Sequence, residues 1–250
     1  MSNEVRSVAR ALDILSAFSP AHPRLHLSEL ADAVGLPRPS VRRLAVTLIE
    51  RGFLRQAADG TYLLGPRLLE LGGVVAEGSP TTRRTREAAD ELARRTGETV
   101  LVAEVDWDNL SLLIIGKRHP VHPSAAITSA VGNRYPLASG CLAKAALSGL
   151  PAEGAAAIVP RLRLTPRTVS TIVDPRRLAA DVEASRERGY AMQSGEFLAG
   201  MAGAAVPVHD GERVVGALAV LGSAPRFPHQ HLHRTGRLVR QVLSHHKPQP

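Results

Sequence analysis

The sequence is poor in cysteine and in aromatic residues, and each shortage excludes a class of function. Its one cysteine, Cys141, excludes an internal disulfide framework and a cysteine-rich zinc site, and it fits a reducing compartment. Aromatic residues are 3% of the chain, so aromatic platforms that stack single-stranded bases are not expected. No apolar run approaches the roughly 18 to 20 residues of a membrane span. We therefore expect a cytoplasmic protein with no membrane partner.

The chain does contain enough apolar sequence for two domains. Of its 250 residues, 44% are hydrophobic and 22% are charged, and this balance excludes a disordered chain. The formal net charge of +8 indicates a polyanionic partner. The excess is not concentrated at one end, since residues 1–65 hold eight arginines against six acidic residues. A local arrangement must therefore locate the binding site, because phosphate contacts are short-ranged at physiological salt.

The most informative local arrangement is a short basic segment over residues 38–51. Apolar residues recur there at helical spacing and predict a stripe that packs on a core: Val41, Leu44, Ala45, Leu48 and Ile49. Pro39 fits the first turn of a helix, so the helix should begin near Arg38. The exposed first turn then carries side chains suited to phosphates and base edges. The candidates for DNA contact on this helix are Arg38, Pro39, Ser40, Arg42 and Arg43.

A second predicted helix, over residues 27–34, lies immediately upstream, with Ser28 as candidate N-cap and Gly35 as its end. Two short helices joined by a glycine-containing turn, the second one basic, are typical of a helix-turn-helix. Downstream, two β-prone runs around Asp59-Gly60 predict a hairpin, which would form a wing. Arg55 and Thr61 are its candidate phosphate contacts. The alternative is an ordinary helical core segment with solvated arginines.

The remaining pattern predicts a connecting helix and a second domain. Residues 67–76 predict a linker helix that pairs with its copy in a second subunit. From Gly97 the sequence alternates between β-prone runs (99–105, 110–115, 201–208 and 214–221) and helical runs (141–150, 152–159, 175–188 and 230–244). This order favours an α+β domain around an antiparallel or mixed sheet. The expected division is 1–65 for the DNA-binding domain, 66–80 for the linker and 81–250 for the second domain.

Short blocks along almost the whole chain carry a family resemblance through their joint order and spacing. They are residues 7–15, 27–31, 35–37, 60–65, 96–100, 164–168, 189–191, 196–200 and 205–208. In this order they resemble the IclR family of bacterial transcriptional regulators. The resemblance implies a winged helix-turn-helix joined by a linker helix to a GAF-like α/β sensor domain, in homodimers or dimers of dimers on palindromic operators. It implies a sequence-specific repressor of transcription whose DNA binding is modulated by a small-molecule effector.

The resemblance also implies where the effector binds. The family pocket lies between the sheet and the segments that correspond to residues 196–203 and 215–222, and its candidate residues here are Leu101, Ala103, Met192, Glu196, Ala202, Gly203, Ala219 and Leu221. Many relatives hold a carboxylate with hydroxyl groups where this chain has alanine, glycine or leucine. A hydroxyl buried without a partner costs about 1 to 3 kcal/mol, so these replacements favour an apolar or aromatic effector, or a pocket that has lost its ligand. Glu196 either faces the pocket or pairs with an arginine such as Arg167.

The alternative function is a small-molecule-processing enzyme in which the winged helix serves as an interaction module. Cys141 has no neighbouring base in the sequence that would make it a nucleophile. The spacing of His229, His231 and His233 points these side chains apart on a helix, so they do not predict a metal site. No phosphate loop, nucleophile elbow or paired carboxylates are present. We therefore expect no enzymatic activity, no metal and no cofactor.

Overall fold

The structure is a computed structural model that describes residues 4–119 and 129–246. The chain divides into two compact units, residues 1–77 and residues 78–250. The boundary between them falls within the predicted linker, residues 66–80. Among the described residues, none of the helices combines the length and the apolar character needed to cross a membrane.

The first unit is the predicted winged helix-turn-helix. Its elements are α1 (Arg6–Ser16), α2 (Leu27–Val34), α3 (Arg38–Glu50), β1 (Leu54–Gln56), β2 (Tyr62–Leu64) and α4 (Arg67–Gly78). The two strands pair antiparallel as the wing, with Arg55 opposite Leu63. One apolar core joins the three helices to the wing, and its buried residues include Ile14, Leu30, Val41, Leu48 and Tyr62.

The turn between α2 and α3 sets the direction of the basic helix. Gly35 ends α2 with φ +63°, a conformation that favours glycine. Pro37 then precedes α3, which begins at Arg38 as predicted. The predicted N-cap of α2 was wrong. The helix begins at Leu27 with His26 as N-cap, because the His26 amide donates to Glu29 Oε2 at 2.6 Å and Ser28 therefore lies inside the first turn.

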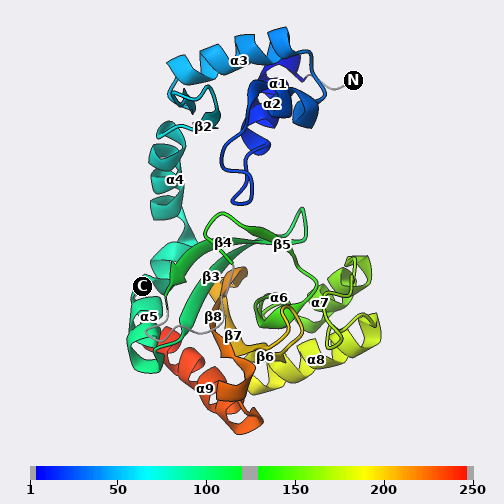
Figure 1. The fold of residues 1–250 in the computed structure, drawn as a ribbon. Coiled ribbons are helices and arrows are strands. Elements are labelled where there is room, and N and C mark those ends of the chain that lie inside the picture. Colours follow the sequence, from blue (N-terminus) through cyan, green and yellow to red (C-terminus); the bar gives the residue numbers. More distant parts are fainter. Residues whose placement is uncertain (1–3, 120–128, 247–250) are drawn as a thin grey trace. The chain divides into compact units, whose positions relative to one another are not determined.

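The second unit is an α+β domain built on one sheet (Figure 1). Its helices are α5 (Pro80–Thr96), α6 (Gly140–Ser148), α7 (Ala152–Ile158), α8 (Pro175–Arg188) and α9 (His229–His245), with short 3₁₀ turns η1 (Val159–Arg161) and η2 (Ala224–Arg226). Its strands are β3 (Thr99–Asp106), β4 (Ser111–Arg118), β5 (Arg134–Pro136), β6 (Ala191–Ser194), β7 (Met201–Asp210) and β8 (Arg213–Ser223). The strands form a six-stranded sheet in the order β5-β4-β3-β8-β7-β6, and every neighbouring pair is antiparallel. The short strands β5 and β6 are not among the strands that the sequence predicts.

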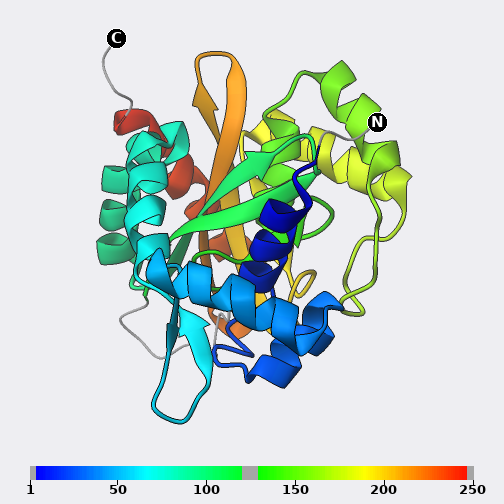
Figure 2. The same cartoon turned by 90° about the horizontal axis from the view of Figure 1, so that it is seen from above.

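The sheet separates two apolar cores, one on each face. Helices α5 and α9 cover one face, and α6, α7 and α8 lie on the other (Figures 1 and 2). Side chains alternate along β3, where Leu101 and Ala103 enter the core beside α6 while Val100 and Val102 enter the core beside α5. The predicted fold class is therefore confirmed. The face beside α6 carries the cavity that is described below as the second candidate site.

Candidate functional site

The first candidate site is the exposed surface of α3. Val41, Ala45 and Leu48 are buried, as the apolar stripe predicted. Arg38, Pro39, Arg42 and Arg43 are exposed on α3, as is Arg51 directly after it, and Ser40 is half-buried. Three guanidinium groups and one hydroxyl thus surround the first turns of one helix. Such a surface can bind phosphates through its charges and base edges through its hydrogen-bond donors.

The wing adds one further basic side chain to this unit. Arg55 on β1 is exposed and can reach a phosphate. Thr61, the other predicted wing contact, is 7% exposed. Its hydroxyl donates to Asp59 Oδ1 at 2.6 Å, and its amide donates to the same oxygen at 3.0 Å. The assignment of Thr61 to a phosphate was therefore wrong, because its side chain shapes the turn of the wing and has no donor left for DNA.

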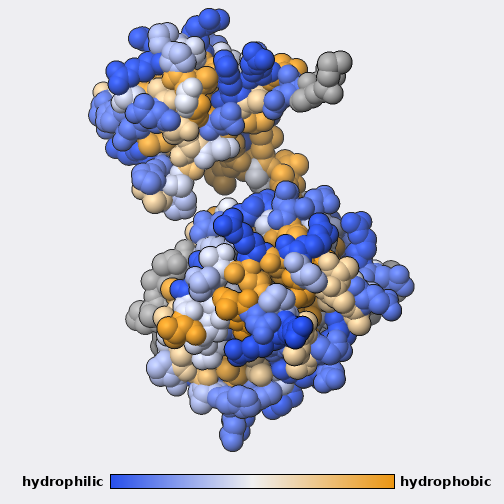
Figure 3. Space-filling model, turned by 90° about the vertical axis from the view of Figure 1, so that its right-hand side faces the viewer, coloured by the Kyte–Doolittle hydropathy of each residue, from blue (hydrophilic) through white to orange (hydrophobic). Residues whose placement is uncertain are grey.

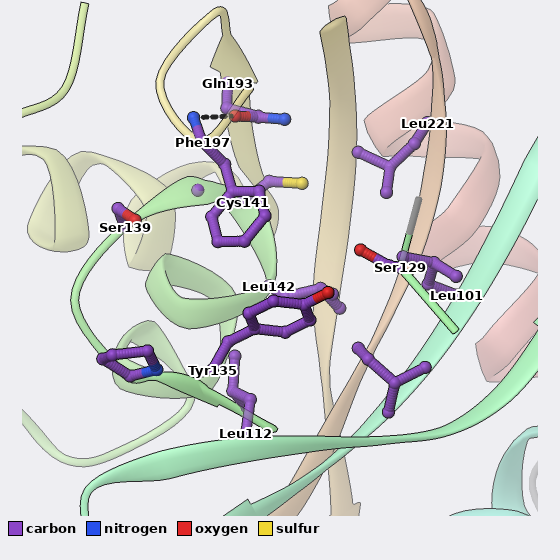
Figure 4. Close-up of a pocket in the computed structure, with 13 residues that line it drawn as sticks. Leu101, Leu112, Ser129, Tyr135, Ser139, Cys141, Leu142, Gln193, Phe197 and Leu221 are labelled. Atoms are coloured by element: carbon purple, nitrogen blue, oxygen red, sulfur yellow. Dashed lines mark hydrogen bonds between the residues drawn. The ribbon is translucent and has the colours of Figure 1, made fainter. Parts of the chain in front are cut away.

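The second candidate site is a cavity between the sheet and the start of α6. About 430 Å³ of space between atoms lies within it, and this figure includes open solvent at the mouth. Leu101 and Leu221 reach in from the sheet, opposite Phe197 and Tyr135 (Figure 4). Further apolar lining comes from Leu112, Ile114, Pro136 and Leu142. No charged side chain belongs to the described residues that line it.

A few polar groups interrupt this apolar lining. Gln193 Oε1 accepts a hydrogen bond from the Phe197 amide at 3.1 Å (Figure 4). Within residues 4–119 and 129–246 no acceptor takes the Gln193 side-chain N–H groups, although the residue is buried. Tyr135 packs edge-on against Phe197 with 5.0 Å between ring centroids. The cavity therefore offers an aromatic and aliphatic surface with one amide donor and the hydroxyl-bearing residues Ser129, Tyr135 and Ser139, which suits an uncharged, mainly apolar guest.

The predicted effector residues divide between the two faces of the sheet. Leu101 and Leu221 line the cavity. Ala103 and Ala219 lie in the core on the same face without lining the cavity. Gly203 pairs with Leu221, and a Cβ at Gly203 would lie 2.6 Å from Leu221 Cδ2. Gly203 therefore contributes indirectly, by leaving room for the leucine that lines the cavity.

Met192 and Ala202 were assigned to the wrong face. Both pack into the core beside α5 and α9, on the side of the sheet away from the cavity. Gln193, the neighbour of Met192, is the residue of β6 that lines the cavity. Because side chains alternate along a strand, a shift of one residue reverses the face. Recognition of residues 191–194 as a strand would have supplied this signal.

Glu196 does neither of the two things expected of it. Its carboxylate does not line the cavity, and it pairs with Lys144 instead of Arg167. Lys144 on α6 is 1% exposed, and its Nζ lies 2.6 Å from both Glu196 Oε1 and Asp181 Oδ2. Burial raises the pKa of the Glu196 carboxyl, although the Lys144 charge and hydrogen bond oppose this rise. The three charges tie α6 and α8 to the segment that carries Phe197.

Cys141 packs in the apolar core and is not a candidate nucleophile. It is buried in α6 at the cavity wall. Burial raises the pKa of its thiol to about 12, so the nucleophilic thiolate is not formed near neutral pH.

Comparisons with known proteins cover almost the whole chain. The model of the IclR helix-turn-helix domain matches residues 7–58. The model of the bacterial transcriptional regulator IclR C-terminal domain matches residues 76–245. The chain belongs to the IclR family. Among its relatives, the transcriptional regulator KipR of Bacillus subtilis is 31% identical over 233 residues, which cover 93% of this chain and 92% of KipR.

Further IclR family members agree in sequence and in fold. The transcriptional repressor IclR of Escherichia coli is 25% identical over 240 residues, which cover 95% of this chain and 87% of the repressor. The IclR crystal structure from Thermotoga maritima has a TM-score of 0.80 at 23% identity, covering 97% of this chain and 98% of that one. An IclR homologue from Microbacterium hydrocarbonoxydans complexed with 4-hydroxybenzoate has a TM-score of 0.83 at 20% identity, covering 96% and 97%.

These IclR relatives decide between the two functions considered from the sequence. Their names are those of transcriptional regulators and repressors, and the matched helix-turn-helix domain is a DNA-binding module. This chain is accordingly a DNA-binding transcriptional regulator and not an enzyme, and the alternative of a small-molecule-processing enzyme is dismissed.

Proposed function

We propose that this regulator is a repressor that binds a palindromic operator as a homodimer and responds to an apolar or aromatic effector. The observation that carries the DNA part is the exposed basic turn of α3, presented by a buried apolar stripe. Arg38, Ser40 and Arg42 are assigned to base edges, and Arg43 and Arg55 to phosphates. Phosphate contacts fix the register and base contacts give the specificity, so the two groups must respond differently to substitution.

The experiment is a titration of the full chain with DNA from directly upstream of its own gene, and with scrambled DNA of equal length, across salt concentrations. Arg42→Ala should weaken operator binding more than scrambled binding, because a lost base contact costs about 1 to 3 kcal/mol only on the correct sequence. Arg55→Ala should weaken both alike and reduce the salt dependence by about one phosphate contact. Equal losses for the two variants on both DNAs would contradict the assignment.

The exposed apolar surface of α4 supports the proposed homodimer. None of its residues is buried, and Leu69, Val74 and Val75 are 81%, 71% and 70% exposed. Figure 3 colours the segment that joins the two units mainly as apolar. A helix that is apolar and uncovered gains stability by packing on a partner, and a second copy presents the same surface.

Sedimentation equilibrium tests this assembly. Leu71 and Val75 lie four residues apart on one face of α4, so Leu71→Lys with Val75→Lys should shift the chain toward monomers. Glu77→Gln changes the charge of an exposed polar residue of the same helix and should leave the assembly intact. An unchanged mass in the double variant would refute α4 as the interface. A mass of four chains in the parent would indicate a dimer of dimers.

The effector part rests on the cavity lined by Leu101, Leu221, Phe197 and Tyr135. The relative complexed with 4-hydroxybenzoate holds an aromatic molecule, and this supports an aromatic ligand here. An uncharged aromatic probe such as benzamide should raise the melting temperature, because a ligand that binds the folded state stabilises it by mass action. A screen in which only small oxoacids such as pyruvate raised it would contradict an apolar effector.

Control of DNA binding is proposed to work by population shift. An effector that prefers one arrangement of the sensor unit changes the fraction of dimers whose two α3 helices match the operator spacing. Operator titrations with and without the bound probe measure this coupling. We also propose that the chain acts in the cytoplasm, where its DNA partner lies.

A further inference from the structure

The mouth of the cavity continues into a second, outer hollow whose charge differs from that of the cavity. Pro136, Ser139 and Phe197 line both spaces. The outer hollow encloses about 920 Å³ of space between atoms, including open solvent. Arg163 and Arg167 also line it, and no acidic residue does so among the described residues. A neutral cavity thus opens into a positively charged one.

The two arginines are available to a ligand. Both are exposed, and no carboxylate within residues 4–119 and 129–246 forms a salt bridge with either. Arg167 is also oriented, because its guanidinium carbon lies 4.1 Å above the centre of the Phe197 ring and its Nε donates to the Phe197 carbonyl at 3.3 Å. Its remaining N–H groups can therefore meet an anion beside the ring that lines the inner cavity.

An anion belongs in the outer hollow and not in the inner cavity. A carboxylate inside would be removed from water with no charged side chain among the described lining residues, and only the first turn of α6, at Gly140 and Cys141, would offset its charge. Such burial is strongly unfavourable. At the mouth, by contrast, two guanidinium groups offer charge-assisted hydrogen bonds that are about twice as strong as neutral ones.

We propose that the effector is an amphipathic molecule, with an uncharged aromatic or aliphatic body in the inner cavity and an oxyanion end group bound by Arg163 and Arg167. This inference rests on the proposed effector function and adds the chemical class of the ligand. It makes Arg163 and Arg167 the residues that determine specificity for the anionic end. The spacer between body and anion must be long enough to reach from the cavity to its mouth.

The test uses the full chain and a series of phenylalkanoates, namely benzoate, 3-phenylpropionate and 5-phenylpentanoate, each paired with its primary amide. Isothermal titration calorimetry gives the ratio of amide to acid dissociation constants. Benzoate should bind no more tightly than benzamide, because its carboxylate cannot leave the inner cavity. The longest acid should bind about ten-fold or more tightly than its amide, as expected for hydrogen bonds to a charged group.

Substitutions then locate the preference. Arg163→Gln and Arg167→Gln should each reduce the acid preference, and the double variant should bring the ratio close to one while still binding the amide. Arg176→Gln, an exposed arginine on α8 that lines neither space, removes the same charge and should leave the ratio unchanged. Unlike Arg167, Arg163 forms no hydrogen bond or ring contact with Phe197 in the described structure, so its variant separates anion recognition from cavity shape.

Each outcome decides between the inferences. If the amides bind and no acid binds more tightly, the anionic end group is refuted while the effector cavity stands. An acid preference that survives in the double variant refutes the roles of Arg163 and Arg167. If neither acids nor amides bind, the cavity takes no apolar guest, and this inference falls together with the effector part of the proposed function.

Discussion

Replacement of Lys144 by methionine should destabilise the second unit, residues 78–250, severely. The Lys144 side chain is 1% exposed, and its ammonium group lies 2.6 Å from each of two carboxylates. Removal of one partner from a buried ion pair costs about 3 to 5 kcal/mol, because the remaining charge stays buried and uncompensated. For a domain of about this size each kcal/mol shifts the melting temperature by roughly 2 to 4 °C, so Lys144→Met should lower it by roughly 6 to 20 °C.

Glu196→Gln is the matched comparison. It keeps the contact between Lys144 and Asp181, and it removes a carboxylate whose pKa is already raised by burial. The expected loss is therefore smaller, about 1 to 2 kcal/mol for the weakened hydrogen bond. In the double variant Asp181 still has Arg188 at 3.4 Å, so the double variant should be more stable than the sum of the two single losses predicts.

Urea unfolding and thermal melting of the four proteins give these free energies. If Lys144→Met lowered the free energy of unfolding by less than about 1 kcal/mol, the buried ion pairs of Lys144 would not stabilise the fold as expected, and the assignment would be refuted. Strict additivity of the two single substitutions would also refute it, since it would mean that the two side chains do not interact.

Three further results follow from the geometry. Gly203→Ala should lower the free energy of unfolding by about 1 to 3 kcal/mol. The added Cβ would clash with the Val220 carbonyl and would lie 2.6 Å from Leu221 Cδ2. The control is Gly154→Ala on α7, whose added Cβ meets only ordinary contacts and should not destabilise the fold. Hydrogen bonds to Glu91, and to a smaller extent to Glu87, raise the pKa of His246 above 6.5. Protonated His246 therefore stabilises the fold fully below about pH 6.5, and this stabilisation is lost as the pH rises through the raised pKa. Melting curves from pH 6 to 9 should show this loss in the parent and not in His246→Gln. Cys141, with its thiol pKa at about 12, should resist iodoacetamide at pH 8 in the folded chain and react in urea, and rapid alkylation of the folded chain would contradict its burial.

Elements with strong local signals were predictable from the sequence. Helix α8 has the bounds expected, Pro175–Arg188, because Asp174 caps its start, proline fits its first turn and Gly189 ends it with φ +79°. Helix α3 likewise begins at Arg38 beside two prolines. In both cases the residues that specify the boundary lie within a few positions of it.

Features set by distant contacts were not predictable. Strand β5 has three residues and β6 has four, so neither is long enough for its alternation to show which face is buried. Met192 was a candidate through the family resemblance, which did not show that Met192 and Gln193 lie on opposite faces of β6. The partner of Glu196 lies 52 positions away in the chain, and only the packing of α6 against the loop brings the two charges together. Pairing at such a separation leaves no local pattern in one sequence.

The cavity and the core beside α5 and α9 lie on opposite faces of the sheet, so substitutions in the cavity need not disturb that core. The cavity draws its lining from one face alone, through residues such as Leu101 and Leu221, while α5 and α9 pack on the other face. Substitutions on the α6 face could therefore change the proposed effector, while the core beside α5 and α9 stays unchanged and keeps the fold stable. A substitution such as Leu221→Ser would add a hydroxyl to the cavity in one step, and it would make the proposed effector site more polar.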